Sequence, residues 1–164
     1  MTSPLEAVAL EPMDPRADPA RAILRSYFVE IVGRYYGREA TEEEIDSAIR
    51  EFPSDDLAPP RGLLIVARER RTVLGCAGLR LLADGVGEVT RVFVVRSARG
   101  AGLGERLMHE VELHARTLGV RELRLDSRRD LVEGQRLYAR IGYEQTAPFN
   151  DGPYADRWFR KRIA

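Results

Sequence analysis

The chain has 164 residues, of which 44% are hydrophobic and 32% are charged, and its formal net charge is zero. A chain of this length and mixed composition predicts one folded domain over residues 1–164 and excludes a disordered protein or a small disulfide scaffold. The balanced charge provides no basic field for nucleic acid or a membrane surface, and no apolar run approaches the roughly 20 residues that span a bilayer.

The first segment of the chain predicts a strand followed by a helix. A loose alternation of apolar and polar residues predicts the strand over 5–11. Apolar residues at helical spacing predict a helix over 18–36, with Asp18 as its N-cap. Gly37 follows directly and should end this helix.

The next segment predicts a short acidic helix, a loop and a meander of strands. Thr41 followed by three glutamates fits a capping box, so a helix should begin there and end near Phe52. Prolines and aspartates over 53–60 predict an exposed loop. Three apolar runs separated by short turns then predict antiparallel strands over 62–67, 72–82 and 87–95.

The last part of the chain alternates helices and strands. Apolar residues predict a helix ended by Gly119, with a buried stripe made of Leu103, Leu107, Val111, His114 and Leu118. It is followed by an expected strand over 122–126, a helix over 130–141 and a final strand over 154–163. This order of elements indicates a mixed α/β fold.

The turn that joins the strand over 87–95 to the following helix carries the strongest functional signal. Glycine occupies alternate positions in this turn, which runs from Arg99 to Gly104. Such a turn exposes consecutive backbone N–H groups at the positive end of a helix dipole, and the missing side chains allow a phosphate to approach closely. The Arg99 guanidinium adds donors suited to phosphate oxygens. The sequence therefore predicts a phosphate site here.

Two other glycine-rich motifs compete for the same turn. A P-loop requires Lys and Ser or Thr after its last glycine, whereas Glu105 follows Gly104. The dinucleotide fingerprint can be laid on Gly102 and Gly104, and Asp126 ends the next strand as a ribose-binding acid would. Its third glycine position is Leu107, however, and the segment after Asp126 is too short for a second nucleotide-binding half. A nicotinamide-dependent oxidoreductase is therefore disfavoured.

The remaining pattern, R-x-x-G-x-G over residues 99–104, resembles the acyl-CoA pyrophosphate motif of the GNAT superfamily of N-acetyltransferases. Two flanking segments strengthen the resemblance, which is close over 62–145: residues 88–94 resemble the fourth strand of that family, and residues 137–143 resemble its L-Y-x-x-x-G-[FY] segment. The resemblance implies a GNAT fold, in which helices flank a mixed, mostly antiparallel and splayed sheet. It also implies direct transfer of an acetyl group from acetyl-CoA to an amine in a ternary complex.

The resemblance implies roles for individual residues. The backbone of the glycine-rich turn should hold the pyrophosphate and that of the preceding strand the pantetheine arm, so the expected cofactor-binding residues are Phe93, Val94, Val95, Arg99, Gly100, Ala101, Gly102, Leu103, Gly104 and Glu105. Tyr138 should protonate the departing thiolate, the alternative being a core aromatic. Glu88 should deprotonate the amine if burial raises its pKa, the alternative being a solvated turn residue.

The partners and surroundings follow from the same resemblance and from composition. The acyl acceptor should be a small-molecule amine or a peptide, framed by Tyr27, Tyr35, Tyr36 and residues 148–154. Acetyl-CoA is the expected cosubstrate, no metal is required, and neither nucleic acid nor a membrane is an expected partner. We expect a monomer or homodimer, and the single cysteine favours a reducing cytoplasm. The alternative function is a non-catalytic sensor that binds acyl-CoA.

Overall fold

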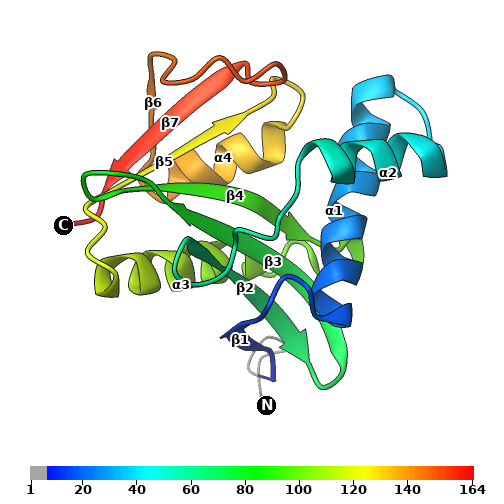
Figure 1. The fold of residues 1–164 in the computed structure, drawn as a ribbon, viewed down its shortest axis with the longest axis horizontal. Coiled ribbons are helices and arrows are strands. Elements are labelled where there is room, and N and C mark those ends of the chain that lie inside the picture. The colour runs from blue at the N-terminus through cyan, green and yellow to red at the C-terminus, as the bar shows by residue number, and fades with distance from the viewer. Residues whose placement is uncertain (1–6) are drawn as a thin grey trace.

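The computed structural model describes residues 7–164, and its strands form a seven-stranded sheet in the order β1-β2-β3-β4-β5-β7-β6 (Figure 1). Neighbouring strands are antiparallel except for β4 and β5, which are parallel. The expectation of a mixed, mostly antiparallel sheet is confirmed. The strands are β1 (Ala9–Pro12), β2 (Gly62–Glu69), β3 (Thr72–Leu81), β4 (Val86–Val94), β5 (Glu122–Ser127), β6 (Glu144–Thr146) and β7 (Arg157–Arg162).

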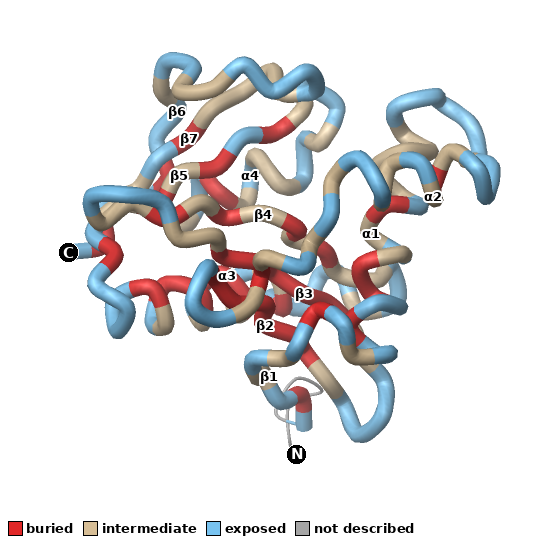
Figure 2. Tube along the Cα trace, in the orientation of Figure 1, coloured by how far each residue is buried: buried red, intermediate tan, exposed pale blue. Residues whose placement is uncertain are grey.

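Helices cover both faces of the sheet, which explains why β2 is apolar at almost every position. Leu63 and Ile65 belong to the core that includes α3, whereas Leu64 and Val66 pack in a second core with α1. Figure 2 shows the buried residues concentrated along the centre of the sheet and its covering helices. In the described part of the chain, no helix is long and apolar enough to cross a bilayer. The helices are α1 (Asp18–Tyr36), α2 (Glu42–Glu51), α3 (Leu103–Thr117) and α4 (Val132–Arg140).

The N-terminal elements are of the expected types, but some of their boundaries differ from those expected. The strand expected over 5–11 is observed as β1, and residues 5 and 6 lie outside the described residues. The N-cap of α1 is Ala17 rather than Asp18, because Asp18 already has helical conformation and places its negative charge in the first turn. The capping box of α2 is present: the Thr41 side chain accepts from the Glu44 amide, and the Glu44 carboxylate accepts from the Thr41 amide.

The C-terminal elements differ more from expectation. The buried stripe of α3 ends in Ala115 rather than in His114 and Leu118, because the helix stops at Thr117 and Leu118 remains 49% exposed. The helix expected from residue 130 begins at Val132, and the strand expected over 154–163 is the shorter β7. The sequence analysis missed β6, a short, largely exposed edge strand with no apolar run of its own.

The separation of β4 from β5 positions the functional site. The two strands pair only from Val86 to Glu88, and Figure 1 shows them diverging beyond these residues. A β-bulge lies in β4 at the same place, since Gly78 pairs with Thr90 while Cys76 pairs with Phe93. The bulged residue Arg91 has a φ of 57°. Because a bulge bends and twists its strand, it helps to turn β4 away from β5 and leaves an opening between them.

Candidate active site

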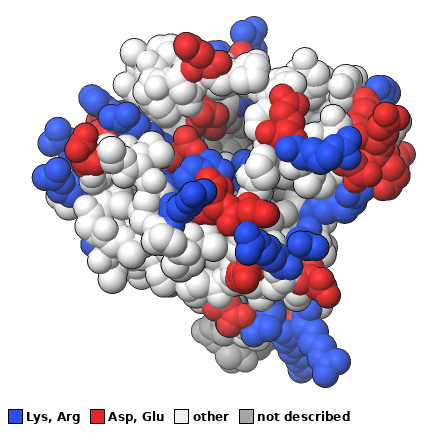
Figure 3. Space-filling model, in the orientation of Figure 1, with Lys and Arg blue, Asp and Glu red and all other residues white. Residues whose placement is uncertain are grey.

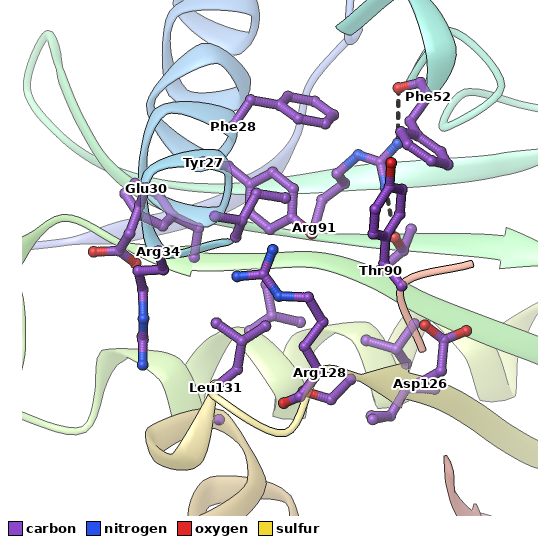
Figure 4. A pocket seen from close by; sticks show the side chains of 18 of the residues that line it. Tyr27, Phe28, Glu30, Arg34, Phe52, Thr90, Arg91, Asp126, Arg128 and Leu131 are labelled. Atoms are coloured by element: carbon purple, nitrogen blue, oxygen red, sulfur yellow. Dashed lines mark hydrogen bonds between the residues drawn. The ribbon is translucent and has the colours of Figure 1, made fainter. Parts of the chain in front are cut away.

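A cavity of 1330 Å³ occupies the opening between β4 and β5 (Figure 4). One part, here called the turn end, is formed by residues 98–105 where β4 leads into α3. The other part, here called the aromatic end, lies between α1, α2 and the loop before β7, and its rings are those of Tyr35, Tyr36, Phe52 and Tyr154. The two ends are continuous, so a long ligand bound at one end can reach the other.

The turn end presents unused backbone donors at the start of α3. The amides of residues 100–105 donate no hydrogen bond to any described residue. Gly100 and Gly102 have φ values of 85° and 84°, and no atom lies within 4 Å of the position where either would carry a Cβ. Consecutive free N–H groups at a helix N-terminus, with no side chain over them, suit a bound phosphate group. These residues therefore fit the pyrophosphate of an acyl-CoA.

The Arg99 guanidinium, which the sequence suggested would be available to phosphate, already has hydrogen-bond partners in the protein. Its Nε donates to the Val94 carbonyl at 2.7 Å, and its Nη2 donates to both carboxylate oxygens of Glu30 on α1, at 2.7 and 2.9 Å. The guanidinium thus links α1 to the end of β4 across the turn end. The Val95 amide is also engaged, because it donates to Leu74 of β3. A phosphate that binds Nη2 would have to displace Glu30.

Tyr138 lies on α4 with its ring buried and its side chain lining the cavity. The ring centroid is 5.9 Å from that of Tyr143 and 6.0 Å from that of Phe159, so the ring itself belongs to the core. Its hydroxyl lies above Gly134, where a Cβ would come within 3.6 Å of it. Burial, followed by the charges of Tyr27 and Asp126, raises the pKa of Tyr138, which keeps the phenol protonated and able to donate.

Glu88 lines the same cavity but is engaged in an ion pair. Nη1 of Arg80 donates to the Glu88 carboxylate at 2.6 Å, and the same guanidinium binds Asp56 through its Nε and Nη2. Only 21% of the Glu88 side chain is exposed. Glu88 is therefore neither a solvated turn residue nor a buried carboxylate without a partner, which were the two alternatives expected from the sequence. The Glu88 carboxylate is thus held in place by Arg80.

The sequence analysis missed Arg91, whose side chain enters the cavity wall from the β4 bulge. Its guanidinium donates to the Phe52 carbonyl, the Ser54 hydroxyl and the Thr90 hydroxyl, and it has no carboxylate partner among the described residues. Burial lowers the pKa of Arg91. The bonds to Phe52 and Ser54 tie the C-terminus of α2 to the sheet. A second charged residue, after Glu88, within the mostly apolar strand β4 was the signal available in the sequence.

The aromatic end gathers the residues that the sequence analysis associated with the acceptor. Tyr27, Tyr35 and Tyr36 line the cavity, as do residues 152–154 but not 148–151. Tyr35 and Tyr154 meet edge to face at 5.4 Å between ring centroids, and Phe52 joins them at 5.8 Å from Tyr154. Figure 3 shows acidic side chains gathered at the edge of this face, whereas elsewhere on it the two signs of charge intermingle. The acidic first turn and the C-terminal Glu51 of α2 border this end.

A match to a known protein family shows which family this chain belongs to. Residues 21–143 match the model of the acetyltransferase (GNAT) family, a segment that holds most of the sheet, the glycine-rich turn and Tyr138. The chain belongs to this family. The resemblance drawn from the sequence is thereby confirmed.

Individual relatives agree with this membership. An uncharacterized N-acetyltransferase of Schizosaccharomyces pombe is 29% identical over 138 residues, which cover 83% of this chain and 81% of the relative. An IAA acetyltransferase of Azospirillum brasilense is 37% identical over 99 residues, or 60% of this chain and 63% of the relative. PaiA N-acetyltransferase of Thermoplasma acidophilum, solved in complex with coenzyme A, superposes with a TM-score of 0.75 over 94% of this chain and 98% of its own, at 19% identity. That structural likeness concerns the fold.

Proposed function

We propose that this GNAT acetyltransferase transfers an acetyl group from acetyl-CoA to the amine of a small molecule or peptide. The single observation that carries the proposal is the continuity of the cavity, which joins backbone donors at the turn end, unused within residues 7–164, to the space lined by aromatic rings at the other end. Acetyl-CoA supplies the acyl group and a thiolate that can leave. Because both ends open into one space, the amine can attack the thioester directly in a ternary complex.

Each part of the cavity has a separate task in this proposal. The amides of residues 100–105 hold the pyrophosphate, and the β4 backbone over 93–95 holds the pantetheine arm, with Arg99 exchanging Glu30 for a phosphate oxygen. Tyr138 donates its proton to the departing sulfur, and burial keeps the phenol protonated until the thiolate develops. Glu88, the carboxylate that the sequence suggested for removing a proton from the amine, is already held by Arg80.

The test of this proposal is acetyl-CoA-dependent thiol release with a panel of amines, amino acids and peptides, measured on the wild type and on Tyr138→Phe. We expect the substitution to lower kcat about 100-fold or more, because general acid catalysis contributes at least that much, and to leave acetyl-CoA affinity unchanged. Tyr143→Phe is the matched control: its ring lies beside that of Tyr138, but its buried hydroxyl has no hydrogen-bond partner among the described residues, so turnover should be unaffected.

The same experiment separates an enzyme from a sensor. Acetyl-CoA at about 100 times its dissociation constant should stabilise the fold by about 2.7 kcal/mol in either case. A protein that is stabilised by acetyl-CoA but releases no thiol with any acceptor would be a sensor and would contradict the proposed activity. Failure of acetyl-CoA to raise the melting temperature at all would overturn the assignment of the turn end.

A further inference from the structure

Asp126 is another of the carboxylates that line the cavity, and it lies on the strand opposite Glu88. It lies in β5 two residues beyond Arg124, the last residue of β5 that pairs with β4. At this point the opening has already formed, and Asp126 lines the cavity. Figure 4 shows its carboxylate turned into the space that Arg128 and Tyr27 also face. Asp126 is close enough to Tyr138 for its charge to contribute to the raised pKa of that phenol.

Within residues 7–164, the Asp126 carboxylate has no cationic partner. Its only hydrogen bond to a described residue comes from the Asn150 side-chain amide, at 2.9 Å to Oδ2. No Lys, Arg or His of residues 7–164 lies within ion-pairing distance of it, whereas Glu88 contacts the Arg80 guanidinium at 2.6 Å. An acceptor enters as an ammonium ion and would provide the missing positive charge. Of the two carboxylates that line the cavity from β4 and β5, Glu88 is held by Arg80, and Asp126 is the one available to bind that ion and take its proton.

A chain of hydrogen bonds fixes the direction of Asp126. Trp158 lies opposite Asp126 in the register of β5 and β7, and its indole N–H donates to the Asn150 side-chain oxygen at 3.0 Å. Because an indole N–H can only donate, Asn150 must direct its oxygen toward Trp158 and its NH₂ group toward Asp126. This arrangement occupies Oδ2 with a neutral donor, and no described residue donates to Oδ1. A positioned carboxylate with one free oxygen is suited to accept a proton.

We propose that Asp126, rather than Glu88, is the catalytic residue that removes the proton from the acceptor ammonium. This assignment rests on the proposed acetyl transfer. One N–H bond of the ammonium breaks and its proton passes to the Asp126 carboxylate and then to water. The freed nitrogen lone pair forms the new C–N bond as the C–S bond breaks. Tyr138 gives its proton to the sulfur, and the second proton lost by nitrogen restores the phenol through exchange with water.

The experiment compares two acceptor probes that differ in the proton to be removed. Benzylamine is an ammonium ion at neutral pH, whereas O-benzylhydroxylamine has nearly the same size and is already neutral. Thiol release from acetyl-CoA is measured with each probe for the wild type, Asp126→Asn and Glu88→Gln. We expect Asp126→Asn to lower kcat/KM for benzylamine about 100-fold or more, and for O-benzylhydroxylamine by less than about tenfold. Glu88→Gln should lower both by less than about tenfold.

Several outcomes are decisive. Equal losses on the two probes in Asp126→Asn, or a larger benzylamine-specific loss in Glu88→Gln, would overturn the assignment. Asp126→Glu keeps a carboxylate and should recover part of the benzylamine activity, and unchanged acetyl-CoA affinity in each variant shows that the protein is folded. If the wild type acetylates benzylamine and Asp126→Asn does so equally well, this inference fails while the proposed function stands. If the wild type releases no thiol with any amine, the proposed function fails and the assignment with it.

Discussion

The two ends of the cavity are built in different ways. The turn end is made of main-chain groups from one contiguous segment, residues 98–105, whereas the aromatic end is assembled from side chains of α1, α2, β4 and β5 and of the loop before β7. A main-chain site depends on the backbone conformation of one segment and does not require particular side chains around it. A side-chain site depends on the packing of distant elements. The first kind can be recognised in a sequence as a motif, and the second emerges only from the fold.

The largest effect that tests this contrast should come from a methyl group on the turn. Gly102→Ala should lower acetyl-CoA affinity about tenfold or more, because its Cβ would stand beside the free amides where the phosphate must approach. Gly119→Ala is the matched control: both glycines have a φ of 84°, neither has an atom within 4 Å of its Cβ position, and they flank the same helix, α3. Calorimetric titration of acetyl-CoA into both variants measures the difference.

The control also separates binding from backbone strain. A non-glycine residue in this conformation costs roughly 1 to 2 kcal/mol, so both variants should melt at a similarly reduced temperature. Only Gly102→Ala should bind acetyl-CoA more weakly. Equal affinities in the two variants would show that the amides of the turn are not the pyrophosphate site.

A smaller effect, of opposite sign, should follow from a side-chain link between the turn end and α1. Arg99 at the turn is held by Glu30 of α1, with 39% and 18% of the two side chains exposed. An exposed pair of this kind is worth about 0.2 to 1 kcal/mol, so Glu30→Gln should free Arg99 and raise acetyl-CoA affinity about two- to fivefold. In an Arg99→Gln background the same change should have no effect. A gain that persists in that background would reflect general loss of negative charge rather than release of Arg99.

Those elements of the fold that carry a strong local signal were predicted from the sequence. The capping box at Thr41, the apolar strands β2 to β4 and the turn before α3 each depend on neighbouring residues, and the structure confirms them. The edge strand β6 could not be predicted, because its three largely exposed residues pair only with the distant β7. The cap of α1 was misplaced by one residue, since Asp18 stabilises a helix start both as a cap and within the first turn.

The residues of the site show the same difference between local signals and contacts with distant elements. The glycines of the turn were predicted, and the structure shows their amides free at the start of α3. The partners of Arg99 and Glu88 were not predicted, because Glu30 and Arg80 lie in elements that only the fold brings next to them. Asp126 was noted only as a possible ribose-binding acid. The opening beside it depends on where β4 leaves β5, which no local pattern records.

The smallest predicted effect concerns how α2 is held at the aromatic end. The Arg38 guanidinium and then the Thr41 amide hold the pKa of Glu44 down to about 2, from an ordinary value of 4.5. Since this pKa is lowered by folding, the stability from ionised Glu44 is fully present above pH 4.5 and is lost as the pH falls toward about 2. Urea unfolding of the wild type and Glu44→Gln should therefore differ at neutral pH and converge over that interval. Glu43→Gln is the control, because it removes the same charge from the same helical turn and Glu43 has no side-chain hydrogen bond to a described residue. If the stability of that variant converges with the wild type by an equal amount, the effect comes from helix charge alone and not from the hydrogen bonds that hold α2.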